Sequence, residues 1–133
     1  MPLIDSSIWI AGWRGGVPAI NEALISLIES NDASINPLIL TELLQGALNS
    51  KHQEAIAQLL APIPVLPLPN RLWTEAPKLY LRMRQKGVTI TTMDCLIAMH
   101  AISERVPLWS ADGIFQDIRA HSDLRLFQPP GKP

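Results

Sequence analysis

The chain has 133 residues, of which 47% are hydrophobic and 17% charged, and its formal net charge is -1 at pH 7. This balance predicts one globular domain with a true core, and it excludes a disordered chain and a strongly basic nucleic-acid-binding protein. No apolar run approaches the roughly 18 residues of a membrane span, and we expect no signal peptide. Cys95 is the only cysteine. It cannot form an internal disulfide, which fits the reducing cytoplasm.

The first expected element is a short strand at Leu3 and Ile4, which ends at Asp5. An apolar run without polar alternation is typical of a strand buried on both faces of a parallel sheet. Ligands of open α/β sheets bind beyond the carboxyl ends of the strands, so Asp5 is a candidate site residue. The competing interpretation is structural, because Asp5 or Ser6 also suits the start of a following helix as an N-cap.

A turn is expected after this strand because three glycines follow it; they are Gly12, Gly15 and Gly16. Apolar residues at helical spacing then predict an amphipathic helix over 17–29. A short second strand is expected at Ser34 and Ile35.

Asn36 as N-cap and Pro37 as first helical residue predict the start of a helix that continues through Leu48. Glu42 lies in the middle of this helix on a largely apolar face, and Gly46 on the same face leaves room for a close neighbour. Glu42 is therefore a candidate site residue. The alternative is that Glu42 only borders the buried stripe, with its carboxylate in water.

The middle of the chain predicts a helix over 52–60, a proline-rich edge strand around Val65 and Leu66, and a helix over 70–86 that stops at Gly87. Pro77 lies inside this last helix. Either the helix kinks there or two short helices meet, because proline removes one backbone hydrogen bond and crowds the preceding turn.

The same 70–86 segment has a local excess of positive charge. Its basic residues are Arg71, Lys78, Arg82, Arg84 and Lys86, against the single acid Glu75. Such a run can track a phosphate backbone, so Arg82, Arg84 and Lys86 are candidates for the rim of an RNA-binding site. A run of this kind is more often only a solvated helix face.

The helix expected over 91–103 is apolar almost all round, which indicates burial within the fold. Asp94 is its only carboxylate. With Thr91 as N-cap, Asp94 falls at the third helical position, where it also suits a capping box. His100 and Cys95 on the same helix are interpreted as core residues.

A buried strand over 106–110 ends in Ser110, and Asp112 follows closely, which repeats the arrangement of an apolar strand and an acid seen at Asp5. A short helix over 113–120 and a last strand over 124–127 precede a loose tail at 129–133. The alternation of strands and helices, without a linker or repeat, predicts a single α/β domain over 1–133 with a parallel sheet.

Four motifs in this order resemble those of the PIN domain, and in particular the small VapC-type toxins of toxin-antitoxin pairs. They are Ile4-Asp5-Ser6-Ser7-Ile8-Trp9, Leu40-Thr41-Glu42-Leu43-Leu44-Gln45-Gly46, Asp94-Cys95-Leu96-Ile97-Ala98 and Leu108-Trp109-Ser110-Ala111-Asp112-Gly113-Ile114-Phe115. The resemblance covers 3–127. It implies a three-layer α/β sandwich with a central parallel sheet, and an endoribonuclease that uses Mg2+ or Mn2+. It also implies an antitoxin partner and a homodimer.

The resemblance places four acids at the positions of the family's acidic quartet, with two serines at polar supporting positions. The acids are Asp5, Glu42, Asp94 and Asp112, and the serines are Ser7 and Ser110. Asp5, Asp94 and Asp112 are expected as metal ligands. Glu42 is expected as a further ligand or as the group that orients the attacking water.

The chain departs from the family pattern at two positions. Ile114 stands where many relatives have a further acid, which leaves a second metal position open. Pro77 falls in a helix that relatives usually run without interruption. Asp117 is an alternative to Asp112 as the fourth acid if the segment after Asp112 is irregular, whereas a regular helix would turn Asp117 toward solvent.

The expected chemistry also follows from the residue types. Carboxylates in one cleft repel one another and raise one another's pKa, and a bound cation removes this repulsion. Ligation by oxygen alone favours Mg2+ or Mn2+ over Zn2+. Such an ion activates water and screens the approaching phosphate, so a nuclease of this kind needs no strongly basic surface. The alternatives are a non-catalytic PIN-like protein-binding module and a receiver-like phospho-acceptor domain. The receiver is disfavoured because Ile4, not an acid, precedes Asp5, and because 106–110 contains no lysine.

Overall fold

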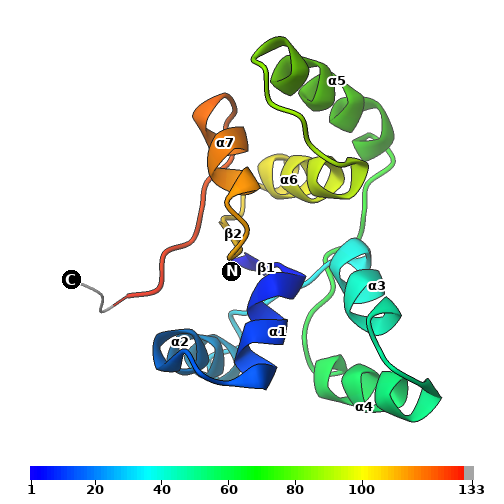
Figure 1. Ribbon diagram of the computed structural model, residues 1–133, viewed down its shortest axis with the longest axis vertical. Helices are drawn as coiled ribbons and strands as arrows, with labels where there is room; N and C mark the ends of the chain where they lie inside the picture. The colour runs from blue at the N-terminus through cyan, green and yellow to red at the C-terminus, as the bar shows by residue number, and fades with distance from the viewer. Residues whose placement is uncertain (131–133) are drawn as a thin grey trace.

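The computed structural model describes residues 1–130, in which helices surround short parallel strands at the centre (Figure 1). The elements in chain order are β1 (Leu3–Ile4), α1 (Ser6–Arg14), α2 (Pro18–Glu29), α3 (Pro37–Gln45), α4 (Ser50–Leu60), α5 (Leu72–Gln85), α6 (Thr92–Glu104), β2 (Leu108–Trp109) and α7 (Ile114–Ala120). The loose tail expected at 129–133 lies partly outside the described residues.

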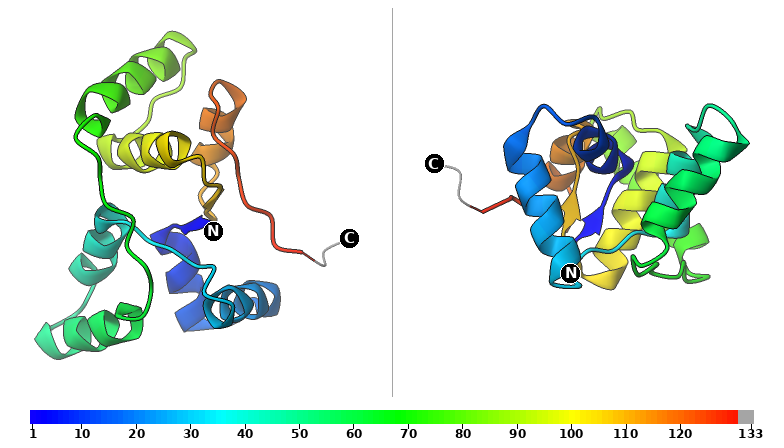
Figure 2. Two further views of the ribbon diagram at one scale, coloured as in Figure 1. Left: turned by 180° about the vertical axis from the view of Figure 1, so that it is seen from behind. Right: turned by 90° about the horizontal axis from the view of Figure 1, so that it is seen from below.

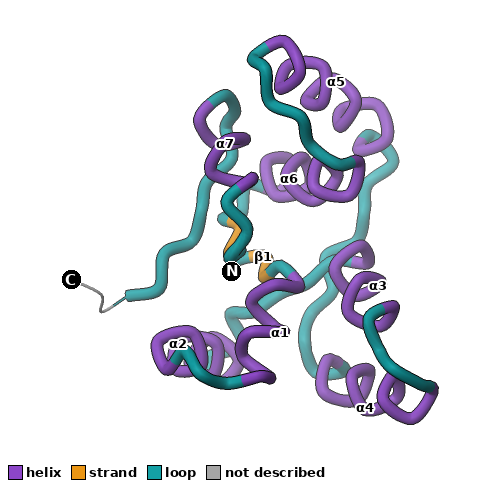
Figure 3. Tube along the Cα trace, in the orientation of Figure 1, coloured by secondary structure: helices purple, strands orange, loops and turns teal. Residues whose placement is uncertain are grey.

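The centre of the fold is a narrow parallel sheet. β1 pairs with β2, with Leu3 opposite Leu108 and Ile4 opposite Trp109. Single parallel bridges widen this pair on both sides; they join Leu3 to Ser34, Ile35 to Val65 and Leu108 to Leu126. Figure 3 shows how short the strands are between the long helices and loops. Each strand segment expected from the sequence therefore takes part in the sheet, and β1 lies in the middle of it.

The position of β1 decides where Asp5 emerges. Leu3 and Ile4 are fully buried, as expected for a strand covered on both faces. The Asp5 N–H donates to the Trp109 carbonyl at 2.9 Å, so the parallel ladder continues up to the acid itself. The carboxyl ends of β1 and β2 therefore meet at one edge, which brings Asp5 and Ser110 together.

The expected helix starts are confirmed by their caps. The Asn36 side chain accepts from the Ile39 N–H at the start of α3, and the Thr91 hydroxyl accepts from the Asp94 N–H at the start of α6. The ends are less well predicted. α3 stops at Gln45, not at Leu48, because Gly46 takes the C-cap position.

The turn expected around Gly12 is wrong, because Gly12 lies inside α1. A Cβ at this position would come within 2.8 Å of Leu24 Cδ2, so the glycine allows α1 and α2 to pack closely. Glycine costs a helix about 1 kcal/mol relative to alanine, which is why the local sequence predicts a turn. Packing against α2 overrides that preference, and the turn comes at Gly15 and Gly16, both at positive φ.

The helix around Pro77 is continuous, so the two-helix alternative is wrong. The face of α5 that packs on α6 carries Ala76, Leu79 and Met83, all buried, and this burial holds the helix together across the missing hydrogen bond. The long axis of the molecule runs from α2 and α4 at one end to α5 at the other (Figures 1 and 2). Among the described residues, no helix is both long and apolar enough to cross a bilayer.

Candidate functional site

Asp5 stands at the N-cap position of α1, but its carboxylate is bonded elsewhere. Ser7 Oγ donates to Asp5 Oδ2 at 2.9 Å, and Ser110 Oγ donates to the same oxygen at 2.7 Å. The side chain makes no capping hydrogen bond with α1, so the N-cap interpretation of this carboxylate is wrong. Asp5 is 6% exposed, and its Oδ1, which accepts no hydrogen bond within residues 1–130, remains open to solvent.

The two serines connect the end of β1 to the turn after β2. Their Oγ atoms lie 3.2 Å apart. Ser7 Oγ accepts from the Ala111 N–H at 3.0 Å, and Ser110 Oγ accepts from the Asp112 N–H at 3.0 Å. Each hydroxyl thus donates to Asp5 and accepts from the β2–α7 turn. These hydrogen bonds tie the backbone of Asp112 to Asp5, and the supporting role of Ser7 and Ser110 stays a prediction.

Glu42 is half-buried in α3, where Ser6 Oγ donates to its Oε1 at 3.2 Å. Burial raises the pKa of the Glu42 carboxyl, and the negative charge of Asp5 raises it further. The hydrogen bond from Ser6 lowers this pKa, and the charge of Asp94 raises it. The carboxylate therefore faces other site residues, which favours the site interpretation over an acid that only borders the core.

Asp94 lies in the first turn of α6 and is also half-buried. Burial raises the pKa of its carboxyl, contact with the Thr91 hydroxyl lowers it, and the charges of Asp112 and Asp5 raise it. The structural and functional interpretations of Asp94 are thus compatible. Its backbone N–H completes the Thr91 cap, while its carboxylate faces the other acids.

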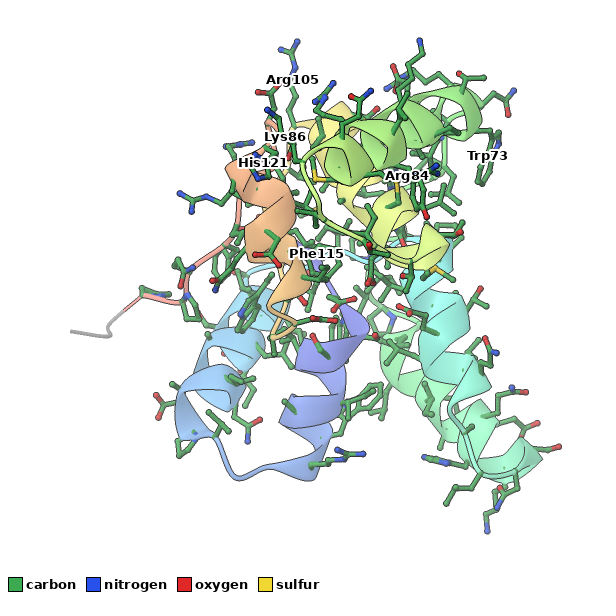
Figure 4. The ribbon with its side chains drawn as sticks, turned by 45° about the horizontal axis from the view of Figure 1, so that its top comes forward. Trp73, Arg84, Lys86, Arg105, Phe115 and His121 are labelled. Atoms are coloured by element: carbon green, nitrogen blue, oxygen red, sulfur yellow. The ribbon has the colours of Figure 1, made fainter. Side chains whose placement is uncertain are left out.

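Asp112 is exposed in the turn between β2 and α7, and its Oδ1 accepts from the Ile114 N–H at 3.1 Å. The following residues form a regular helix, α7, with Phe115 and Ile118 buried. Figure 4 shows Phe115 on the inner side of α7. Asp117 is exposed on this helix. The alternative that made Asp117 the fourth acid required an irregular segment here, and the structure contradicts it.

The fold therefore brings together four carboxylates from separate parts of the chain, which we call the acidic cluster: Asp5, Glu42, Asp94 and Asp112. Asp5 acts electrostatically on both Glu42 and Asp94, and Asp112 acts on Asp94. Asp5 follows β1, Asp112 follows β2, Asp94 lies in the first turn of α6, and Glu42 comes from within α3. Repulsion among them is a cost that the surrounding hydroxyls offset only in part.

The cationic residues expected at an RNA-binding rim do not join this cluster. Arg82 lines a separate cavity with Lys78, Glu75 and Asp123. Arg84 lies on α5 and Lys86 directly follows it, and both are seen with α5 in Figure 4, at the opposite end of the long axis from α4. Their role in RNA binding stays a prediction.

Comparison with known proteins shows the family. The family model for the PIN domain matches residues 3–120. The chain belongs to the PIN domain family. This confirms the resemblance of the four sequence motifs, and the match ends at the last residue of α7.

The relatives of this PIN domain include proteins of toxin-antitoxin pairs. It is 28% identical over 127 residues to a Mycobacterium tuberculosis protein named Ribonuclease VapC32, covering 95% of this chain and 96% of the relative. Similar solved structures include VapBC2 of Rickettsia felis bound to a promoter DNA fragment, with a TM-score of 0.78, 20% identity and coverage of 94% and 96%. VapBC-1 of nontypeable Haemophilus influenzae gives a TM-score of 0.76, 23% identity and coverage of 95% and 96%. At such identities the structural likeness establishes the fold.

Three residues of this PIN domain that contact or adjoin Glu42 were not predicted as site residues. Ser6, considered only as a helix cap, donates to Glu42. Arg14 and His52 line a cavity together with Glu42 and Gly46. No local pattern points to Arg14 or His52, because they come from different helices and meet only through the packing of α1 and α4 around α3. Gly46 was expected to leave room for a close neighbour, and it lines this cavity.

The donor set of this PIN domain suits a hydrated hard cation. Asp5 Oδ1 and Glu42 Oε2 accept no hydrogen bond within residues 1–130, so each acid has an oxygen available. The same residues contain no group of three Asp, Glu, His or Cys side chains close enough to hold an ion directly. Mg2+ usually keeps several waters and contacts only one or two carboxylates, so the cluster fits an ion bound largely through water.

Proposed function

We propose that this PIN domain is a divalent-metal-dependent endoribonuclease that hydrolyses RNA phosphodiester bonds, and that it is the toxin of a toxin-antitoxin pair. The observation that carries the proposal is the acidic cluster, in which four carboxylates with available oxygens face one edge of the sheet. Repulsion among the carboxylates of such a cluster lowers the free energy of unfolding unless a cation neutralises their charge. The relative named Ribonuclease VapC32 supports RNA as the substrate.

We assign the roles within the cluster as the resemblance to the family implies. Asp5, Asp94 and Asp112 would hold Mg2+ or Mn2+, directly or through water, and Glu42 would serve as a further ligand or orient the attacking water. When bound, the ion supplies Lewis-acid activation of water and neutralises charge on the phosphate. Ser7 and Ser110 hold Asp5 in place, and Ser6 orients Glu42.

The partners belong to the same proposal. Several similar solved structures are described as VapBC assemblies, and one is described as a toxin-antitoxin complex from Klebsiella pneumoniae. By analogy, this chain would form a homodimer that a cognate antitoxin restrains. A cytoplasmic location would fit a free, buried Cys95 whose thiol pKa is raised by burial to about 11.

The second candidate is a PIN-like module that has lost catalysis and binds protein. Ile114 favours it, because this half-buried residue packs against the core at the position where many relatives have a further acid. The two candidates differ in whether the remaining acids support turnover.

The test is RNA cleavage by the purified chain in Mg2+ or Mn2+, compared with the same reaction in chelator. Cleavage should require the metal, and Glu42→Gln should abolish it while the fold is retained, because the substitution is nearly isosteric. Glu54→Gln, at an exposed glutamate on α4, is the matched control and should cleave like wild type. Cleavage that persists in chelator, or a fully active Glu42→Gln protein, would refute the proposed chemistry.

A further inference from the structure

A cavity of about 260 Å³ adjoins the acidic cluster on the side of Glu42. Its lining includes Trp13, Arg14, Glu42, Gly46 and His52, and we call it the Trp13 cavity. It lies where the end of α1, the end of α3 and the start of α4 meet, and Figure 1 shows these three helices side by side. The cavity therefore shares one wall, Glu42, with the site described above.

The polar groups of the Trp13 cavity suit a ligand with negative charge. Arg14 is exposed in the last turn of α1 and forms no ion pair within residues 1–130. His52 Nδ1 accepts from the Leu48 N–H at 3.0 Å, which places the ring proton on Nε2 and leaves Nε2–H as an available donor. A guanidinium and an imidazole N–H thus line the cavity beside a carboxylate that carries the opposite charge.

The apolar part of the cavity suits a flat ring. Trp13 is 40% exposed, and its ring centroid lies 6.2 Å from that of the buried Trp9, with the two rings tilted by 39°. An exposed indole held in this way offers a face on which a nucleobase can stack.

Gly46 keeps the cavity open. Its φ of -77° is one that any residue adopts, and a Cβ there would meet only the Glu42 and Leu43 carbonyl oxygens, at 3.6 and 3.7 Å. Neither the backbone nor a neighbouring atom therefore requires glycine at this position. A larger side chain at 46 would enter space that the native chain leaves empty.

We propose that the Trp13 cavity binds one nucleotide of a single-stranded RNA next to the phosphate positioned at the acidic cluster. The base stacks on Trp13, while Arg14 and the His52 Nε2–H bind the adjoining phosphate. This inference rests on the proposed function, because RNA is the ligand of both. It assigns the RNA-binding cations to α1 and α4, and not to Arg82, Arg84 and Lys86 on the distant α5 side.

The first experiment follows tryptophan fluorescence by stopped-flow mixing of the full chain with a single-stranded oligoribonucleotide of about 10 nucleotides, a typical site size. The buffer contains Mg2+, and the rapid mixing allows binding to be measured before cleavage. RNA should quench the wild-type signal and Trp73→Phe should preserve that quench, because Trp73 is an exposed tryptophan on α5 that does not line the Trp13 cavity. Trp13→Phe should remove most of the quench, and Trp13→Ala should weaken binding about 10-fold.

The second experiment compares two exposed arginines, each in the last turn of its helix, so that loss of charge at a helix end is matched. Arg14→Gln should weaken RNA binding and reduce the slope of log Kd against log salt by about 1, while Arg84→Gln should leave both unchanged. Gly46→Leu should weaken binding by filling the cavity, with no fall in melting temperature. This variant separates loss of the cavity from loss of folding.

The outcomes distinguish this inference from the proposed function. A metal-dependent nuclease whose RNA quenches Trp73 and not Trp13, or whose affinity depends on Arg84 and not Arg14, would overturn the subsite and leave the nuclease intact. Quenching of Trp13 by RNA in a protein that never cleaves would support the subsite and refute the catalytic function. An apolar peptide that quenches Trp13 when RNA does not would overturn the inference in favour of protein docking.

Discussion

Two groups of buried polar side chains in residues 1–130, one around His100 and one around Asp5, differ in how far their hydrogen bonds are satisfied. Asn36 and His100 are fully buried, and with Pro67 they form the group that we call the His100 cluster. Asn36 Oδ1 accepts from the Ile39 N–H, so its Nδ2 must donate to His100 Nδ1, at 2.9 Å. His100 Nε2–H then donates to the Pro67 carbonyl at 3.1 Å, and each of these polar atoms has a partner.

The acidic cluster has the opposite character. It gathers four acids, whose neighbouring charges help to raise the pKa of Glu42 and of Asp94, and at least two of their oxygens accept no hydrogen bond within residues 1–130. In a stable core, buried polar groups are neutral and fully bonded, because an unsatisfied buried group costs folding free energy. The free oxygens of the acidic cluster remain open to solvent, so this cluster, unlike the His100 cluster, can take a charged ligand. The two clusters also share elements, since α3 begins at Asn36 and carries Glu42, while α6 carries both Asp94 and His100.

The largest effect is expected at Asp112. Asp112→Asn should slow RNA cleavage by at least about 100-fold, the scale on which single electrostatic groups act at a reacting centre. Asp117→Asn makes the same chemical change on the exposed face of α7 and should leave the rate unchanged. Initial cleavage rates in Mg2+ measure both. An inactive Asp117→Asn protein beside an active Asp112→Asn protein would show that the fourth acid is misplaced.

The His100 cluster should control stability. His100→Ala leaves the Asn36 amide and the Pro67 carbonyl without partners and opens a cavity, so it should lower the free energy of unfolding by about 3 kcal/mol. His121→Ala, at an exposed histidine, should change it by less than about 0.5 kcal/mol. Urea denaturation measures both values. Equal stabilities for the two variants would contradict a structural role for His100.

A bound metal ion should stabilise the folded chain through its contacts with the acidic cluster. At roughly ten times its Kd, Mg2+ or Mn2+ should raise the free energy of unfolding of the wild type by about 1.4 kcal/mol. Asp5→Asn should lose most of this gain, and without metal it should be as stable as wild type or slightly more so, because one source of repulsion is gone. Thermal melts with and without the ion test this, with Asp123→Asn as the exposed control. Equal shifts in wild type and Asp5→Asn would place the metal elsewhere.

The smallest expected effect concerns pH in the absence of metal. The pKa of Glu42 is raised in the folded state, so the folded chain binds this proton more tightly than the unfolded chain does. Ionised Glu42 therefore destabilises the fold at neutral pH, and the penalty disappears as pH falls through the raised pKa toward the ordinary value of 4.5.

Glu42→Gln should thus melt about 1 to 3 °C higher than wild type near neutral pH in chelator, and the difference should vanish on acidification. His100, whose pKa is lowered by burial, acts in the opposite sense, because its stabilisation is lost as pH falls below 6.5. Both proteins contain His100, so this effect cancels in the difference. A difference in melting temperature that grows on acidification would contradict the raised pKa of Glu42.

The sequence by itself determined the elements whose signals are local. Asn36 and Pro37 start α3, Thr91 starts α6, and the apolar run at Leu3 and Ile4 forms a buried strand, because capping and burial depend on residues close together in the chain. The four motifs, taken in order, also identified the family, which the match over residues 3–120 confirms. The three-layer arrangement of the sandwich stays a prediction.

Only the tertiary structure decided features that depend on distant neighbours. Gly12 is helical because α1 must approach Leu24, and local propensity alone predicted a turn. The Asp5 carboxylate accepts from the hydroxyls of Ser7 and Ser110, and not from the backbone of the helix that it was suited to cap, because Ser110 is brought to it from the other end of the chain. Local sequence rules consider only the residues near one another in the chain. In the folded protein, the conformation of a segment also depends on every distant group that packing brings into contact with it.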